Sequence, residues 1–288
     1  MKKLLNISDF SSDDENLKMM EKYQKKYAFD GFEIIKFDLE KDSSRLKDKI
    51  IGYHMRFFPM WLDVYLGKSN MIKEKFPDKM DRFYWCGGDT KEEVIAYYKK
   101  DLQRAKELGA EYVVFHACYV DDEGSLTYEF PYTDEEVLEG VASLMNDVFK
   151  GEDFQFTLLL ENLWWAGLKL HSKKEMELLL EKIEYKNKGF ILDTSHMLNT
   201  NFDLKNLDEG IDYIIENIDK MEELKKYIYG VHLSWSLSGD YVSKMVKKHR
   251  ESQEEREKTK KKIYEYVGQI DYHYPFEDSR ILKVLNKL

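Results

Sequence analysis

The chain has 288 residues, of which 43% are hydrophobic, and this is enough for one large domain with a buried core. Its formal net charge of −10 disfavours a protein that grips duplex DNA, because such proteins bind phosphates through a basic face. Two cysteines exclude a disulfide framework, and no apolar stretch is long enough for a signal peptide or a membrane span. We therefore expect a cytoplasmic protein with no membrane partner.

Short apolar runs alternate with charged segments of helical period along the whole chain. Several of these runs are continuously apolar, as strands buried on both faces of a parallel sheet are. Seven candidate strands follow, at residues 3–8, 31–37, 50–57, 111–117, 154–161, 189–194 and 227–234.

Helix signals fall between these runs. Thr90 begins a capping-box pattern, and the helix that it starts should run to Leu108, with Gly109 as its C-terminal stop. Two more helices of the same kind are predicted over residues 133–149 and 172–183.

The repeated order of strand, helix and strand predicts a parallel sheet with right-handed crossovers. Seven strands with a helix after each favour an α/β fold of the (β/α)8 TIM-barrel type over an open doubly wound sheet. No Gly-rich phosphate loop follows any strand, which also argues against a nucleotide-binding fold. We predict that residues 1–288 form a single barrel domain.

Two segments interrupt this rhythm. Residues 58–88 form a long, aromatic-rich insert, and residues 238–266 form a charged insert in which 244–262 should be an exposed helix. Residues 278–288 read as a helix, so no eighth strand is found. Either the barrel is open, the sequence stops short of that strand, or the strand count is wrong by one.

Histidines and carboxylates stand at or just past the ends of the predicted strands, which in a barrel of this type meet at one mouth. Taken singly, each could be a hydrogen-bonded structural residue or a helix cap. Together they close five consecutive predicted strands, and imidazole mixed with carboxylate is typical of zinc or manganese sites. The candidate ligands at these strand ends are His54, His116, Glu161, Asp193, His196 and His232, and a fifth histidine, His273, falls in the segment Asp271-Tyr-His-Tyr-Pro-Phe. The remaining histidines, His171 and His249, are assigned to the surface.

This ordered series resembles the ligand series of the endonuclease IV group (AP endonuclease family 2) of the xylose-isomerase-like barrel superfamily. The matching motifs are His54, His116, Glu161-Asn162, Asp193-Thr-Ser-His196, His232 and Asp271-x-His273, with Gly31-Phe32-Glu33 as a further similarity to the superfamily. The family's additional Glu on the last strand has no counterpart here.

The resemblance implies up to three divalent ions, with zinc expected and manganese or magnesium as alternatives. One ion would be held by His54, His116 and Glu161. Glu161 would bridge to a second ion, held also by Asp193 and His232, and the third would be held by His196, Asp271 and His273. Such a centre implies phosphodiester hydrolysis by metal-activated water, with Glu161 as the candidate catalytic residue.

Two alternatives stay open. Sugar isomerases and epimerases of the same superfamily use a single ion held by Glu, Asp, His and Glu, and Glu161, Asp193 and His232 match three of these four. A small neutral sugar suits an acidic protein better than DNA does. The expected substrate is therefore a small sugar or a phosphoester, with DNA disfavoured. The second alternative is a non-catalytic metal-binding barrel, supported by the missing final Glu.

Overall fold

The computed structural model describes residues 1–288. Seven strands form one sheet in the order β1-β2-β3-β4-β6-β8-β9, and this confirms the predicted strands and the α/β fold class. The pairs β1–β2, β2–β3, β3–β4 and β8–β9 are parallel. The strands are β1 Leu4–Ser8, β2 Gly31–Ile35, β3 Ile50–His54, β4 Tyr112–His116, β6 Thr157–Glu161, β8 Lys188–Asp193 and β9 Ile228–His232.

A second, two-stranded sheet was not predicted. In it, β5 (Cys118–Tyr119) pairs antiparallel with β7 (Ala166–Gly167). Strands this short carry no sequence periodicity.

The helices follow the strands in chain order. They are α1 Asp13–Tyr27, α2 Trp61–Tyr65, α3 Ser69–Lys75, α4 Lys79–Cys86, α5 Lys91–Leu108, α6 Asp122–Thr127, α7 Asp134–Phe149, α8 Lys173–Lys182, α9 Thr194–Leu198, α10 Leu207–Lys220, α11 Gly239–Glu251, α12 Gln253–Lys260, α13 Ile263–Ile270 and α14 Leu282–Leu285, with 3₁₀ turns η1 Ser44–Lys49, η2 Glu222–Tyr227 and η3 Ser279–Ile281. The three helices predicted from the sequence correspond to α5, α7 and α8.

The chain folds into two compact units. Unit 1 comprises Met1–His116, Leu144–Leu160 and Tyr185–Lys188. Unit 2 comprises Ala117–Ser143, Glu161–Glu184 and Gly189–Leu288. The single domain expected from the sequence stays a prediction.

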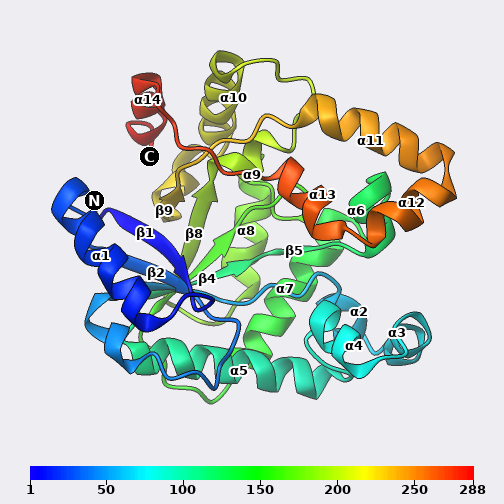
Figure 1. The fold of residues 1–288 in the computed structure, drawn as a ribbon, viewed down its shortest axis with the longest axis horizontal. Coiled ribbons are helices and arrows are strands. Elements are labelled where there is room, and N and C mark those ends of the chain that lie inside the picture. The colour runs from blue at the N-terminus through cyan, green and yellow to red at the C-terminus, as the bar shows by residue number, and fades with distance from the viewer. The chain divides into compact units, whose positions relative to one another are not determined.

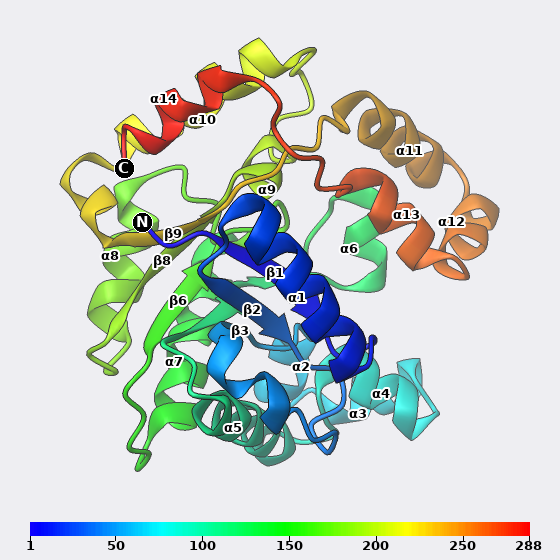
Figure 2. The same cartoon turned by 60° about the vertical axis from the view of Figure 1, so that its left-hand side comes forward.

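Unit 1 contains β1 to β4, which are neighbours in the sheet. Figure 2 shows β1, β2 and β3 side by side. Helix α5 begins and ends as predicted: the Thr90 side chain accepts a hydrogen bond from the Glu93 N–H, and Gly109 closes the helix in the left-handed region. On its buried face, Asp101 accepts hydrogen bonds from the Tyr53 hydroxyl and, at 3.1 Å, from the Arg56 N–H. These two contacts flank His54 and fasten the end of β3 to α5.

The aromatic-rich insert of unit 1 folds into the short helices α2, α3 and α4 (Figure 1, cyan). Trp61 is fully buried within it, and Phe58 lies edge-on to Phe83 and Tyr97. Packing therefore accounts for these aromatic rings.

The charged insert of unit 2 forms α11, α12 and α13 (Figure 1, orange to red). The single exposed helix expected over 244–262 was wrong, because Ser252 leaves the helical conformation and caps α12. The surface assignment of His249 was also wrong: its side chain is 0% exposed. Its ring nitrogens lie 3.2 Å from the Leu126 carbonyl oxygen and 2.9 Å from the Thr259 hydroxyl, so α11 buries one face against α6.

The predicted C-terminal helix is shorter than expected. Residues 278–288 form η3 and α14, and α14 lies beside α10 (Figure 1). No helix combines the length and the apolar character that a membrane crossing needs.

Candidate metal centre

Three of the ligands predicted in unit 2 stand at the ends of strands. Glu161 is the last residue of β6, and Asp193 is the last residue of β8. The parallel register of β8 and β9 pairs Asp193 with His232. Because the backbones are hydrogen-bonded in this register, the two side chains start from neighbouring positions on one edge of the sheet.

The first group of side chains that could hold a metal ion consists of Glu161, Asp193 and His232, and we call it the first ligand group. His232 Nδ1 lies 2.9 Å from Glu161 Oε1 and 3.7 Å from Asp193 Oδ2. One ligand atom from each of the three residues lies within 4.8 Å of the others. This group is the one that both enzymatic interpretations of the sequence require.

Asp193, His196 and His273 form a second ligand group, again with their ligand atoms within 4.8 Å of one another. Asp193 belongs to both groups. Its Oδ1 also caps α9, where it accepts a hydrogen bond from the His196 N–H at 2.9 Å. Asp271 was predicted as a ligand beside the two histidines. Its Oδ2 lies 2.8 Å from His273 Nε2 and 3.2 Å from His196 Nε2.

The carboxylates raise the proton affinity of the histidines among them. Burial alone would lower the pKa of His196, but the charges of Asp193 and Asp271 raise it to about 10. Burial likewise opposes protonation of His273, and its hydrogen bond to Asp271 nevertheless raises its pKa. Burial would raise the pKa of Asp271, yet the two histidines hold it well below its usual range. The site therefore stabilises positive charge.

Asp193 supplies a direct test of whether the residues suit a cation. Its Oδ2 is buried and has no hydrogen-bond partner, and burial raises the pKa of this carboxyl. A buried carboxylate oxygen without a hydrogen bond is costly, and a bound cation removes that cost. Nitrogen and oxygen donors together fit zinc or manganese.

The ring orientation of His196 fits the same purpose. Its Nδ1 lies 2.9 Å from the Asn162 carbonyl oxygen and donates its proton to it. Nε2, which lies 3.2 Å from Asp271 Oδ2, is then the nitrogen that would coordinate a metal. In metal sites, a hydrogen bond of this kind fixes the tautomer of a histidine ligand.

Asn162 ties two ligand-bearing strand ends together. Its side-chain Nδ2 donates to the Asp193 carbonyl oxygen at 3.0 Å, and its Oδ1 accepts from the Asp193 N–H at 2.8 Å. The side-chain amide thus makes the pair of hydrogen bonds that a neighbouring strand would make, next to Glu161 in the sequence.

Unit 1 carries the two remaining predicted ligands. The rings of His54 and His116 meet edge to face with centroids 4.6 Å apart. His54 Nδ1 lies 2.9 Å from the Met55 carbonyl oxygen, which leaves Nε2 as its ligand atom. Glu33 of the Gly-Phe-Glu similarity is buried and accepts a hydrogen bond from the Tyr112 hydroxyl at 2.7 Å.

Residues outside the predicted set shape the site in unit 2. Trp164 is buried and packs against the His196 ring, with centroids 5.2 Å apart. Two buried serines lie next to Asp271. Ser195 Oγ is 3.2 Å from Asp271 Oδ1, and Ser236 Oγ accepts a hydrogen bond from the Tyr272 N–H at 3.0 Å. Ser195 lies within the Asp-Thr-Ser-His motif and could have been noted, whereas no sequence signal marks Ser236. His171 is half-buried and hydrogen-bonds to Thr200 and Tyr213, away from the ligands.

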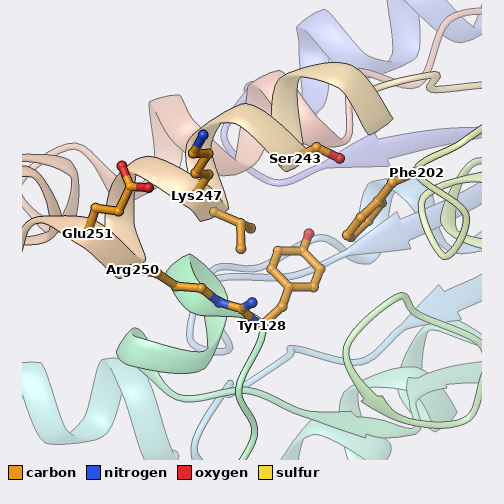
Figure 3. A pocket seen from close by; sticks show the side chains of 7 residues that line it. Tyr128, Phe202, Ser243, Lys247, Arg250 and Glu251 are labelled. Carbon is orange, nitrogen blue, oxygen red and sulfur yellow. The ribbon is translucent and has the colours of Figure 1, made fainter.

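A hollow of about 440 Å³ lies apart from these ligands in unit 2. The rings of Tyr128 and Phe202 face it below α11, and the side chains of α11 cover the other side (Figure 3). None of the lining residues is a predicted ligand, so the hollow gives no support to the metal assignment.

One curated protein is similar to part of the chain. The probable endonuclease 4 of Mycoplasma mobile is 29% identical over 146 residues, which cover 50% of this chain and 47% of that protein. The chain therefore matches about half the length of this curated relative.

Two solved structures are similar to the chain over most of its length. The structure of L-ribulose 3-epimerase is 15% identical with a TM-score of 0.50, over 93% of this chain and 98% of that one. Endonuclease IV from Thermus thermophilus is 16% identical with a TM-score of 0.48, over 81% and 76% of the two chains. The xylose isomerase-like TIM barrel family matches residues 22–276, and the chain belongs to that family.

Proposed function

We propose that the chain is a divalent-metal-dependent phosphoester hydrolase of the endonuclease IV type. The observation that carries this proposal is the pair of ligand groups in unit 2 that share Asp193. A sugar isomerase or epimerase with one ion needs only Glu161, Asp193 and His232. The second group, with His196, His273 and the adjoining Asp271, has no task in that chemistry.

The candidate ligands would have the following roles. Asp193 belongs to both groups and would hold two ions, with Glu161 and His232 on one side and His196 and His273 on the other. The resemblance also assigns His54 and His116 to an ion with Glu161, and this assignment stays a prediction. When bound, divalent ions act as Lewis acids that stabilise charge on the oxygens of a phosphoester. Glu161 is the candidate catalytic residue because its ligand group is common to both interpretations.

The substrate class follows from charge and fold together. The net charge of −10 disfavours long contacts with a DNA backbone, so a small phosphoester is the first candidate and abasic DNA the second. The curated endonuclease 4 relative favours the phosphoester interpretation, although it is matched over only part of its length.

The testing experiment is elemental analysis of the purified protein, expressed as ions per chain, followed by assays. Two or three ions, mainly zinc, with hydrolysis of bis-p-nitrophenyl phosphate or abasic DNA would support the proposal. One ion, with epimerisation of a ketose and no hydrolysis, would replace it by the sugar isomerase or epimerase alternative. No ion after reconstitution with zinc and manganese would overturn both and favour a non-catalytic barrel.

A further inference from the structure

Two buried serines of unit 2 lie behind the Asp271-x-His273 segment. Ser195 is in α9, Ser236 follows β9, and each is 0% exposed. Buried hydroxyls are retained where they satisfy other polar groups, so their partners show what they hold in place.

Ser236 holds the backbone of the segment. Its Oγ accepts hydrogen bonds from the N–H groups of Tyr272, at 3.0 Å, and His273, at 3.2 Å. His273 has a φ of 48°, in the left-handed region that is unfavourable for a residue with a Cβ. The two hydrogen bonds fasten the turn in which this strained residue sits.

The Ser195 hydroxyl connects Ser236 to Asp271. Its Oγ donates to Ser236 Oγ at 2.5 Å, the same oxygen that accepts from the two backbone N–H groups. Ser195 Oγ also lies at donating distance from Asp271 Oδ1, at 3.2 Å. A hydroxyl has one proton, so Ser195 shares it between these two acceptors.

The two oxygens of Asp271 have different partners. Asn199 Nδ2 also lies 3.3 Å from Asp271 Oδ1, and the Ser238 hydroxyl fixes Asn199 through a 2.9 Å hydrogen bond to its Oδ1. Asp271 Oδ2 is left to face the rings of His196 and His273.

We propose that Ser236 and Ser195 form a hydroxyl relay, a hydrogen-bonded pair of side chains that positions Asp271 and His273 for metal binding. The proposal rests on the metal centre proposed above and extends it to residues that touch neither metal nor substrate. Both serines are positioning residues: Ser236 acts through the backbone of the turn, and Ser195 acts through the Asp271 carboxylate.

The test uses the full chain with Ser236→Ala and Ser195→Ala. Zinc affinity is measured by competition with a chromogenic chelator, and amide hydrogen exchange at Tyr272 and His273 is measured on the metal-free protein. Ser236→Ala should speed exchange at both amides and weaken zinc binding about 10- to 100-fold, as loss of a supporting hydrogen bond commonly does. Ser195→Ala should weaken zinc binding but leave the exchange slow, because Ser236 still accepts from the two amides.

Ser234→Ala is the matched control. Ser234 lies two positions before Ser236 in the chain, and its hydroxyl is buried without a hydrogen-bond partner. Slow exchange in Ser236→Ala, or zinc affinity in both variants equal to that of the control, would overturn the relay. A wild-type chain that binds no zinc would overturn the metal centre alone, and faster exchange in Ser236→Ala would then still support the hold on the turn.

Discussion

In unit 2 the carboxylates and histidines of the two ligand groups lie close together, and the carboxylates favour positive charge. Glu161 Oε1 lies 2.9 Å from His232 Nδ1, and removal of either residue leaves the first ligand group with two members. A divalent ion held by two protein ligands binds far more weakly than one held by three.

We therefore expect Glu161→Ala and His232→Ala each to lower the number of ions per chain, measured by elemental analysis after dialysis. His171→Ala is the control, because His171 hydrogen-bonds to Thr200 and Tyr213 and belongs to neither ligand group. Unchanged stoichiometry in both ligand variants would remove the basis of the site.

Asp101 in unit 1 makes a second prediction at this scale. Complete burial raises the pKa of Asp101 to about 6, although the hydrogen bonds from Tyr53 and the Arg56 N–H favour its charged form. The folded-state pKa lies above the ordinary value of 3.8, so protonation favours the folded form. The stability contributed by this group is present below about pH 4 and is lost as the pH rises through about 6.

Relative to the wild type, Asp101→Asn should therefore gain up to about 3 kcal/mol of stability between pH 4 and pH 8, on top of a pH-independent cost because Asn has a donor where Asp101 accepts from the Arg56 N–H. Urea unfolding across this pH range measures it. The exposed carboxylate of Asp48 gives the control variant Asp48→Asn, which should show no such trend. A constant difference between Asp101→Asn and wild type at all pH values would show that the carboxyl titrates normally.

At the scale of elements, the short β5–β7 ladder depends on one glycine. Gly167 has a φ of 128°, and a Cβ at this position would lie 2.4 Å from the Ala117 carbonyl oxygen. Neither the conformation nor the space admits a side chain. Because glycine has no Cβ, β7 can lie this close to Ala117 where it pairs with β5.

Gly167→Ala should destabilise the protein by about 2 kcal/mol or more, since strain and steric overlap add. Thermal unfolding followed by circular dichroism measures the change. Gly268→Ala in α13 is the contrasting substitution: a Cβ added there would meet no atom within 4 Å, so better helix propensity should stabilise by about 0.5–1 kcal/mol. Equal effects of the two substitutions would show that the ladder tolerates a Cβ.

For the whole molecule, the proposed metal binding would be linked to folding. A ligand that binds only the folded state at about a thousand times its dissociation constant adds about 4 kcal/mol of stability. In unit 2, a bound cation would attract three carboxylates, Glu161, Asp193 and Asp271, and its removal would lose that attraction.

Treatment with a chelator should thus lower the Tm by about 10 °C, and added zinc should restore it. Differential scanning fluorimetry measures this shift. Glu161→Ala serves as the control, with a smaller response to both treatments. A wild-type Tm that is insensitive to chelator and to zinc would contradict the linkage.

The parts of this molecule that were predictable from sequence are those encoded by local patterns. Continuous apolar runs identified all seven strands of the main sheet, and Thr90 and Gly109 gave the ends of α5. The grouping of Glu161, Asp193 and His232 was predictable because parallel strands end at a common edge, and their role as ligands stays a prediction.

Features created by contacts between distant segments were not predictable. His249 is buried because α11 meets α6, 123 positions away in the chain, although the helix reads as a solvated, charged segment. Likewise, nothing local to Ser236 indicates that two backbone N–H groups more than thirty positions later will point at its hydroxyl.

The hydrogen bonds of the Asn162 side-chain amide limit which amino acids position 162 can accept. Only an amide of this length offers a donor and an acceptor side by side, as a peptide group does, and both are engaged by the backbone of Asp193. An isosteric carboxylate would place an oxygen against the Asp193 carbonyl, and glutamine would be one methylene too long. The Asn162 amide takes the place of a peptide group between the strand ends that carry Glu161 and Asp193. Position 162 therefore has no conservative replacement among the natural amino acids.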